Sequence, residues 1–269
     1  MSRIESCFNA IKKNNKKALI PFLTAGDPSP NITASLMHEL VLAGSDIIEL
    51  GVPFSDPMAD GPVIQRASER ALAQNTNTDD VFNIVADFRT KDKTTPVILM
   101  GYSNPIEIMG YSKFTKKASN AGVDGLIVVD LPPEESSDLQ EALTLYDIDQ
   151  IFLLSPTTID KRLKMICEAA SGFLYYVSLK GVTGSNQLDI KMVEEKINEI
   201  RTKTTLPLAV GFGIKDVQVA EGIGRISDAV VIGSALVEII AKYAKNTKEM
   251  KKRISSFISS LRKVLDNIQ

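Results

Sequence analysis

Short apolar runs recur along this chain, and each is followed by a loop and then by a stretch whose apolar positions have the helical period. Most of the runs are apolar through their middle rather than alternating between apolar and polar residues. This pattern is typical of parallel strands covered on both faces, because a strand with one wet face alternates. Eight runs predict strands: residues 18–24, 46–51, 96–102, 125–130, 150–155, 172–178, 207–213 and 229–234.

Amphipathic stretches between these runs predict the connecting helices: residues 31–43, 62–74, 113–121, 134–145, 160–170, 188–202 and 215–224. Eight strand–helix units in about 250 residues predict an α/β fold of the (β/α)8 type, the TIM barrel. An open, doubly wound sheet is the alternative, but it needs no eight similar units and usually carries a glycine fingerprint after its first strand. Residues 24–28 form a turn without that fingerprint.

Three further helical patterns, at residues 3–13, 78–89 and 242–266, predict an N-terminal helix and peripheral helices added to the barrel. No stretch rich in serine and glycine divides the chain into parts that would fold separately. We therefore expect a single TIM-barrel domain over residues 1–269.

The composition narrows the function. The chain has 269 residues, of which 44% are hydrophobic and 24% charged, as in soluble globular proteins. Its net charge of -2 gives no field that would attract nucleic acid or an anionic membrane, so neither is expected as a partner. No apolar run approaches the roughly 20 residues of a membrane span, and the N-terminus has no signal-peptide core, so we expect a cytoplasmic protein.

Histidine and cysteine are scarce. His38 is the single histidine and lies in a helical pattern, where we expect it on the helix surface. Without a second histidine, a multi-histidine metal site is not supported, and neither is a Ser-His-Asp triad. Cys7 and Cys167 lie far apart without metal-ligand spacing, so we expect free thiols and no metal site. Proton transfer would then fall to carboxylates, tyrosine or lysine.

Glu49 lies inside the second apolar run, and Asp60 follows eleven residues later on a loop. Burying a charged carboxylate costs roughly several kcal/mol unless another group compensates for the lost hydration. Active sites of TIM barrels lie at the carboxyl ends of the strands, where Glu49 is placed, so an acid–base role is one explanation. The structural alternative is that Glu49 pairs with a lysine and that Asp60 caps the helix predicted to begin at Pro62.

Glycine motifs follow the last three predicted strands, at residues 180–185, 211–213 and 233–234. Glycine lets backbone N–H groups approach an anion closely, and a helix N-terminus adds partial positive charge. Loops after strands seven and eight are a recurrent phosphate site in this fold. Together the motifs predict a phosphorylated small-molecule substrate.

Six segments, spread in order over essentially the whole chain, resemble the α chains of tryptophan synthase. They are residues 21–28, 48–61, 101–105, 181–184, 211–213 and 233–235. Met58 and Val63 depart from the leucine and threonine that this family often has, and both carboxylates are retained. The resemblance implies a lyase that cleaves indole-3-glycerol phosphate to indole and glyceraldehyde 3-phosphate by a retro-aldol reaction. Glu49 would transfer protons, and Asp60 would stabilise the positive charge that develops on the indole.

The resemblance also implies the substrate-binding residues. Tyr175 would lie close to Glu49 or the glycerol chain. Independently of the resemblance, residues 179–188 are rich in glycine and small polar residues, so we expect a mobile loop that brings Thr183 towards Asp60 when it closes. An indole pocket would be lined by Phe22, Met100, Tyr102, Ile127, Phe212 and Ile232. The phosphate would be held by Gly184, Gly213, Gly233 and Ser234. For Phe22 and Phe212, plain core packing is the alternative.

The resemblance implies a partner as well. The α chains of this family work with a pyridoxal-phosphate-dependent β chain in an α2β2 heterotetramer, and indole passes from one to the other. Pro53, Asp56, Asn104 and Pro132 would lie at that interface. This chain shows no sequence context for a Schiff-base lysine, so we expect no cofactor in it and pyridoxal phosphate in the partner.

Two other functions stay open on the sequence. Another phosphate-binding barrel is possible, such as an indole-glycerol-phosphate synthase or a sugar-phosphate isomerase or epimerase, because a fold alone does not determine chemistry. An epimerase would normally need histidines and often a metal. A non-catalytic regulatory subunit is the other alternative, and the presence of both Glu49 and Asp60 argues against it.

Overall fold

The computed structural model describes residues 1–177, 190–211 and 213–268, and its strands form one parallel sheet. The order is β5-β4-β3-β2-β1-β9-β8-β7-β6. The two outer strands of this order, β5 and β6, are separated only by Ile151, whose N–H donates to the carbonyl of Leu126 at 3.0 Å. They are one interrupted strand, so the sheet closes on itself. The strands are β1 Ala18–Thr24, β2 Ile48–Gly51, β3 Val97–Gly101, β4 Gly125–Val128, β5 Asp149–Gln150, β6 Phe152–Leu154, β7 Leu174–Val177, β8 Leu208–Gly211 and β9 Ala229–Ile232.

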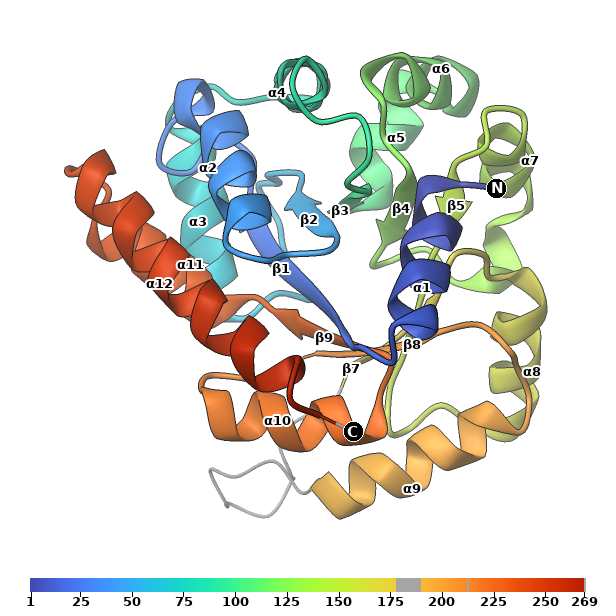
Figure 1. Cartoon of the computed structure of the whole chain (residues 1–269). Coiled ribbons are helices and arrows are strands. Elements are labelled where there is room, and N and C mark those ends of the chain that lie inside the picture. Colours follow the sequence, from blue (N-terminus) through green and yellow to red (C-terminus); the bar gives the residue numbers. More distant parts are fainter. Residues whose placement is uncertain (178–189, 212, 269) are drawn as a thin grey trace.

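The predicted (β/α)8 barrel is therefore confirmed, and the open doubly wound sheet is not formed. Helices surround the strands on all sides (Figure 1). They are α1 Arg3–Lys13, α2 Pro30–Leu42, α3 Pro62–Leu72, α4 Thr78–Arg89, α5 Ser103–Met109, α6 Tyr111–Ala121, α7 Ser137–Thr144, α8 Asp160–Ala169, α9 Ile190–Arg201, α10 Val217–Ile226, α11 Ser234–Lys242 and α12 Thr247–Leu265, with a short 3-10 helix at Pro133–Glu135. Within the described ranges, none of these helices is long and apolar enough to cross a membrane.

Two helices differ from the prediction by more than a shift of a few residues at their ends. The stretch 242–266 contains the end of α11 and a separate helix α12, because Asn246 accepts a hydrogen bond from the backbone of Glu249 and caps a new helix at Thr247. Helix α5 was not predicted. It spans seven residues with a proline at its third position, which is too short for a helical period to be recognised.

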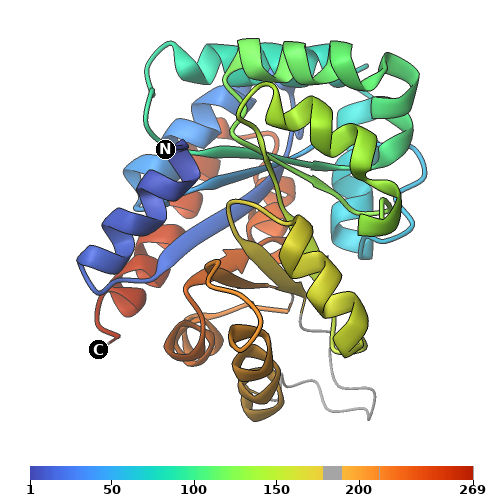
Figure 2. The same ribbon diagram turned by 90° about the vertical axis from the view of Figure 1, so that its right-hand side faces the viewer.

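Side chains on the strands divide between two apolar layers. Alternate residues point into the barrel, including Ile20, Ile47 and Ile98, and the other set packs against the surrounding helices. Helix α1 closes one end of the interior, where Phe8 contacts Phe173 with ring centroids 5.6 Å apart. This helix and both chain ends lie on the left in Figure 2. The opposite end of the barrel, where the strands finish, is left for the site.

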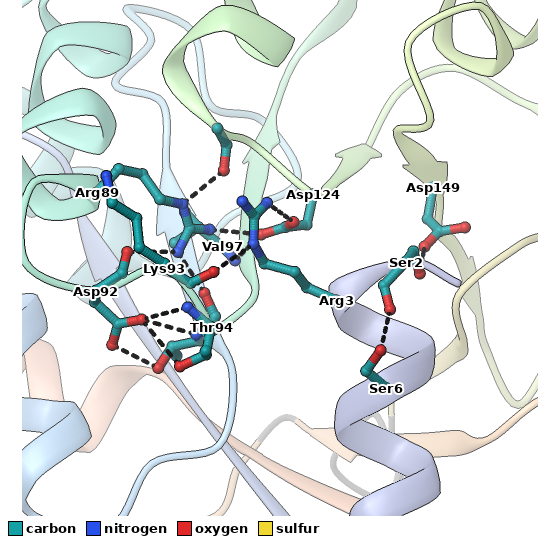
Figure 3. Close-up of polar contacts among 12 residues, drawn as sticks. Ser2, Arg3, Ser6, Arg89, Asp92, Lys93, Thr94, Val97, Asp124 and Asp149 are labelled. Atoms are coloured by element: carbon teal, nitrogen blue, oxygen red, sulfur yellow. Dashed lines mark hydrogen bonds and ion pairs between the residues drawn. The ribbon is translucent and has the colours of Figure 1, made fainter.

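Charged groups at the closed end serve the fold. Asp124, just before β4, accepts hydrogen bonds from the N–H of Val97 at 2.8 Å, from Arg89 at 2.6 Å and from Arg3 at 2.7 Å (Figure 3). Asp46 and Asp228 repeat the arrangement, since each accepts the N–H of the neighbouring strand and pairs with an arginine. These carboxylates are satisfied by charge-assisted bonds.

Candidate active site

Glu49 is a buried acid with an unsatisfied carboxyl oxygen among the described residues. It lies on β2 between Phe22 of β1 and Ile98 of β3, on the same face as Ile47, whose side chain is inside the barrel. Its side chain is 1% exposed, and Oε2 has no hydrogen-bond partner among the described residues. Burial raises the pKa of Glu49 to about 8, and the negative charge of Asp60 adds to the rise. The alternative of an ion pair with lysine is not supported within the described part of the chain.

Asp60 is held by Tyr102. It lies on the loop between β2 and α3, and its Oδ2 accepts a hydrogen bond of 3.0 Å from the Tyr102 hydroxyl. The same hydroxyl accepts the N–H of Ala59 at 3.0 Å. Burial raises the pKa of Asp60, and the Tyr102 hydrogen bond opposes this rise. Asp60 does not cap α3, since Gly61 is the N-cap residue and makes no side-chain capping bond, so that alternative was wrong.

A pocket opens beside Asp60, at the carboxyl ends of β1, β2 and β3. The space between its walls amounts to about 270 Å³, a volume that includes open solvent at its mouth. Its walls are mostly apolar. The lining residues are Phe22, Thr24, Gly51, Val52, Asp60, Ile64, Ser68, Met100, Gly101, Tyr102 and Val129.

Gly51 lets the ring of Phe22 occupy this pocket. A β-carbon on Gly51 would lie 2.5 Å from Cζ of Phe22, closer than any two such atoms can approach. Gly51 is two residues beyond Glu49 on β2, so the ring of Phe22 leans across the strand next to the acid. The strand therefore needs a residue without a side chain at this position.

Tyr175 approaches from the other side of the barrel. It lies on β7 with its side chain in the interior, and both burial and the charge of Glu49 raise the pKa of its hydroxyl. Its hydroxyl packs against Gly211 of β8, where a β-carbon would lie only 2.5 Å from it. Gly211 belongs to the motif at residues 211–213 that predicted a phosphate site. Packing against the Tyr175 hydroxyl is a separate reason for glycine at this position.

The structure brings together four of the residues singled out in the sequence. Phe22, Met100 and Tyr102 line the pocket with Asp60. Ile127 lies fully buried in the barrel interior, one layer below Val129, which reaches the pocket.

Two predicted phosphate residues have open backbone surroundings. Gly213 has a φ of +78° and no neighbouring atom within 4 Å of a β-carbon built on it. Gly233 precedes Ser234, the first residue of α11, and its nearest neighbour in the same test is Phe22 at 3.8 Å. Thr183, Gly184 and Phe212 lie outside the described residues.

Ile232, predicted to line the indole pocket, has its side chain in the apolar layer between the strands and the helices, and it is not among the residues that line the pocket beside Asp60. Val231, its neighbour on β9, faces the barrel interior together with Ala229 and Tyr175. The period of two along a strand gives this result, because residues 229 and 231 share one face and residues 230 and 232 the other. The same alternation could have identified Val231 from the sequence.

Sequence reasoning also missed seven residues that line the pocket, among them Thr24, Val129, Ile64 and Ser68. Thr24 and Val129 lie two positions beyond Phe22 and Ile127, on the same strand faces, so alternation again was the available signal. Ile64 and Ser68 lie four positions apart on α3, one above the other on a single helix face.

The scarce residues lie away from this pocket. His38, on α2, is only half-buried and lies against the ring of Phe88 with centroids 4.6 Å apart, and burial lowers its pKa. Cys7 and Cys167 are free thiols, as expected. Burial raises the pKa of the Cys7 thiol to about 12, which makes it a poor nucleophile.

Comparison with known proteins adds to this geometry. The sequence profile of the tryptophan synthase alpha chain matches residues 8–266. Alpha chains of Thioalkalivibrio sulfidiphilus and Methylococcus capsulatus are 55% and 52% identical to this chain over 266 residues, which cover 99% of this chain and 100% of each relative. The crystal structure of tryptophan synthase subunit alpha from Legionella pneumophila is similar with a TM-score of 0.93 and 45% identity, over 100% of both chains. A chain of tryptophan synthase from M. tuberculosis, in an aminoacrylate-bound form, has a TM-score of 0.87 and 31% identity, over 98% of this chain and 100% of that one.

Proposed function

Because the chain belongs to the tryptophan synthase alpha chain family, we propose that it cleaves indole-3-glycerol phosphate to indole and glyceraldehyde 3-phosphate. This retro-aldol reaction breaks the bond between C3 of the indole and the first carbon of the glycerol chain. C3 must gain a proton, and the hydroxyl on that first carbon must lose one as it becomes an aldehyde. The observation that carries the proposal is the buried carboxyl of Glu49, with a pKa of about 8 and an Oε2 that has no hydrogen-bond partner among the described residues.

Glu49 can make both proton transfers. With a pKa of about 8, most of the carboxyl is protonated at neutral pH, so it can donate its proton to C3. The carboxylate that results can then accept the proton of the glycerol hydroxyl as the bond to C3 breaks. The net change is one proton moved from oxygen to carbon, and Glu49 returns to its starting state.

Asp60 stabilises the positive charge that protonation of C3 places on the indole. An ionised carboxylate next to the ring N–H favours this charged form over the neutral substrate, which lowers the barrier. Tyr102 keeps Oδ2 of Asp60 in place. The apolar side chains of Phe22, Met100 and Val129 surround the ring and keep water away.

The phosphate group belongs at the other side of the mouth, at the ends of β8 and β9. Gly213, Gly233 and Ser234 are the described residues we assign to it, with Gly184 and Thr183 on the loop after β7. The open backbone at Gly213 and Gly233 and the start of α11 support this assignment, because exposed N–H groups at a helix N-terminus favour an anion.

A pyridoxal-phosphate-dependent β chain is the proposed partner, in an α2β2 assembly, and the cofactor belongs to that partner. Asp56 and Asn104 are exposed and follow the carboxyl ends of β2 and β3, whereas Pro132 is half-buried and Pro53 is buried. Ile108 lies on α5, one turn beyond Asn104, and is 82% exposed. An apolar side chain this exposed supports a partner chain that covers this surface. We further propose one domain over residues 1–269 and a cytoplasmic location, as suits a biosynthetic enzyme.

The test is to incubate the purified chain with indole-3-glycerol phosphate and to measure indole and glyceraldehyde 3-phosphate, with and without the β chain. Equal amounts of both products support the proposal. No product under either condition would contradict it, and would favour a subunit that only regulates its partner.

A further inference from the structure

Thr24 has a hydroxyl that the fold does not use. It lies at the end of β1, two residues beyond Phe22 on the same strand face, and it lines the pocket. Its side chain is 2% exposed, and its Oγ1 has no hydrogen-bond partner among the described residues. A buried hydroxyl left unpaired destabilises the protein, whereas valine has the same shape without that cost. A threonine here therefore needs a reason outside the fold.

Ser68 brings a second hydroxyl to the same pocket from a different element. It lies on α3, one turn beyond Ile64, and it is buried. The end of β1 and this part of α3 are tied together, since Arg70 donates two hydrogen bonds of 2.7 Å to the carboxylate of Asp27. Asp27 is three residues beyond Thr24, and Arg70 is two beyond Ser68, so this ion pair connects the two segments that carry the hydroxyls.

The polar groups of the pocket thus come from two regions. Asp60 and Tyr102 are engaged with each other and, under the proposed function, with the ring N–H. An unsubstituted indole has no other polar atom on its ring, so its six-membered part leaves the Thr24 hydroxyl unpaired. A hydroxyl on that part of the ring can pair with Thr24, because a hydroxyl both donates and accepts.

We propose that Thr24, with Ser68, forms a polar subsite that lets this chain cleave indole-3-glycerol phosphates carrying a hydroxyl on the six-membered ring. The inference rests on the proposed function and adds a substrate class to it. Thr24 is a specificity-determining residue, since it distinguishes a polar from an apolar substituent at the same ring position. One hydrogen bond in a closed site gives a discrimination of about five- to tenfold.

The experiment compares hydroxyl and methyl substituents at each position of the six-membered ring, because the two have similar size. The ratio of their kcat/KM values is measured for the wild-type chain and for Thr24→Val, with the unsubstituted substrate in parallel. We expect at least one position where the hydroxyl is preferred, and a fall of about five- to tenfold in that ratio in Thr24→Val. Thr24→Ser keeps the hydroxyl and should keep the preference.

Thr76→Val is the matched control. Thr76 is also 2% exposed with an unpaired hydroxyl, but it does not line the pocket. Its substitution should leave the ratio unchanged. Because neither hydroxyl has a partner to lose, both valine variants should unfold in urea at the wild-type concentration or above it.

Three results would overturn the inference. The ratio could stay the same in Thr24→Val, every hydroxylated substrate could be rejected while the unsubstituted one is cleaved, or Thr24→Val could lower stability and so reveal a structural role. If the wild-type chain does not cleave the unsubstituted substrate, the proposed function itself is wrong, and this inference is wrong with it.

Discussion

The Tyr102 hydroxyl, at the end of β3, donates a hydrogen bond of 3.0 Å to Oδ2 of Asp60, on the loop that follows β2. The same hydroxyl accepts the backbone N–H of Ala59, so one phenol holds both the side chain and the backbone of the loop. Its ring also stacks on Phe54, with centroids 5.1 Å apart. A carboxylate on a loop is thereby fixed by a residue that lies between strand β3 and helix α5, and these elements are a more rigid support than the loop.

Tyr102→Phe should lower kcat/KM by roughly tenfold, since it removes the bond that positions Asp60. In the wild-type chain the Tyr102 hydrogen bond lowers the pKa of Asp60, because it favours the charged form. Removing this bond should raise the pKa of Asp60 and so shift the acid limb of the pH profile to higher pH. Steady-state cleavage rates across pH test both effects. Tyr111→Phe, which removes a phenol bonded to Glu107 on the surface, is the control and should change neither.

Asp60→Asn should lower kcat by about 100-fold or more with little change in KM, because the carboxylate acts on charge that develops during the reaction. Asp56→Asn removes an exposed carboxylate from the same loop and should leave the isolated chain active. If KM rises in Asp60→Asn while kcat is kept, Asp60 is a binding residue and its assigned role is wrong.

The raised pKa of Glu49 predicts how stability changes with pH. Between the ordinary value of 4.5 and about 8, Glu49 is protonated in the folded chain and ionised in the unfolded chain. The folded state then binds more protons than the unfolded state. The contribution of Glu49 to the free energy of unfolding is therefore complete below pH 4.5 and is lost as pH rises to 8.

Glu49→Gln removes this loss. Relative to wild type, the variant should gain stability by about 2–4 kcal/mol as pH rises from 4.5 to 8, measured by urea unfolding at several pH values. Glu141→Gln, at an exposed position on α7, should follow the wild-type curve. Parallel curves for wild type and Glu49→Gln would mean that the pKa of Glu49 is not raised.

Gly51→Ala should push the ring of Phe22 out of its place, since the new carbon would lie 2.5 Å from it. A misplaced wall of the pocket can cost roughly 100-fold in rate, so we expect a fall in kcat/KM of about 10- to 100-fold. Phe22→Leu in the same chain should restore part of the loss by making room. Gly61→Ala has open space around it and should be nearly silent, and equal effects of the two substitutions would contradict the packing account.

Local sequence signals predicted much of this structure. Helices α1 and α4 have the predicted bounds because their amphipathic period begins after a capping residue, Ser2 or Asn77. The position of Glu49 inside the barrel follows from strand alternation. Alternation does not predict that Oε2 of Glu49 has no hydrogen-bond partner among the described residues, because this depends on which side chains the closed barrel brings near it. The Tyr102–Asp60 bond likewise joins residues 42 positions apart, and no local pattern contains it.

The account depends most on Glu49 as the group that carries the proton, and indole release from indole-3-glycerol phosphate by wild type and Glu49→Gln tests it most directly. Glutamine keeps the shape and cannot exchange the proton, so we predict a fall in kcat of ~10²- to 10⁴-fold with phosphate binding and folding retained. A Glu49→Gln chain that releases indole at close to the wild-type rate would contradict the mechanism.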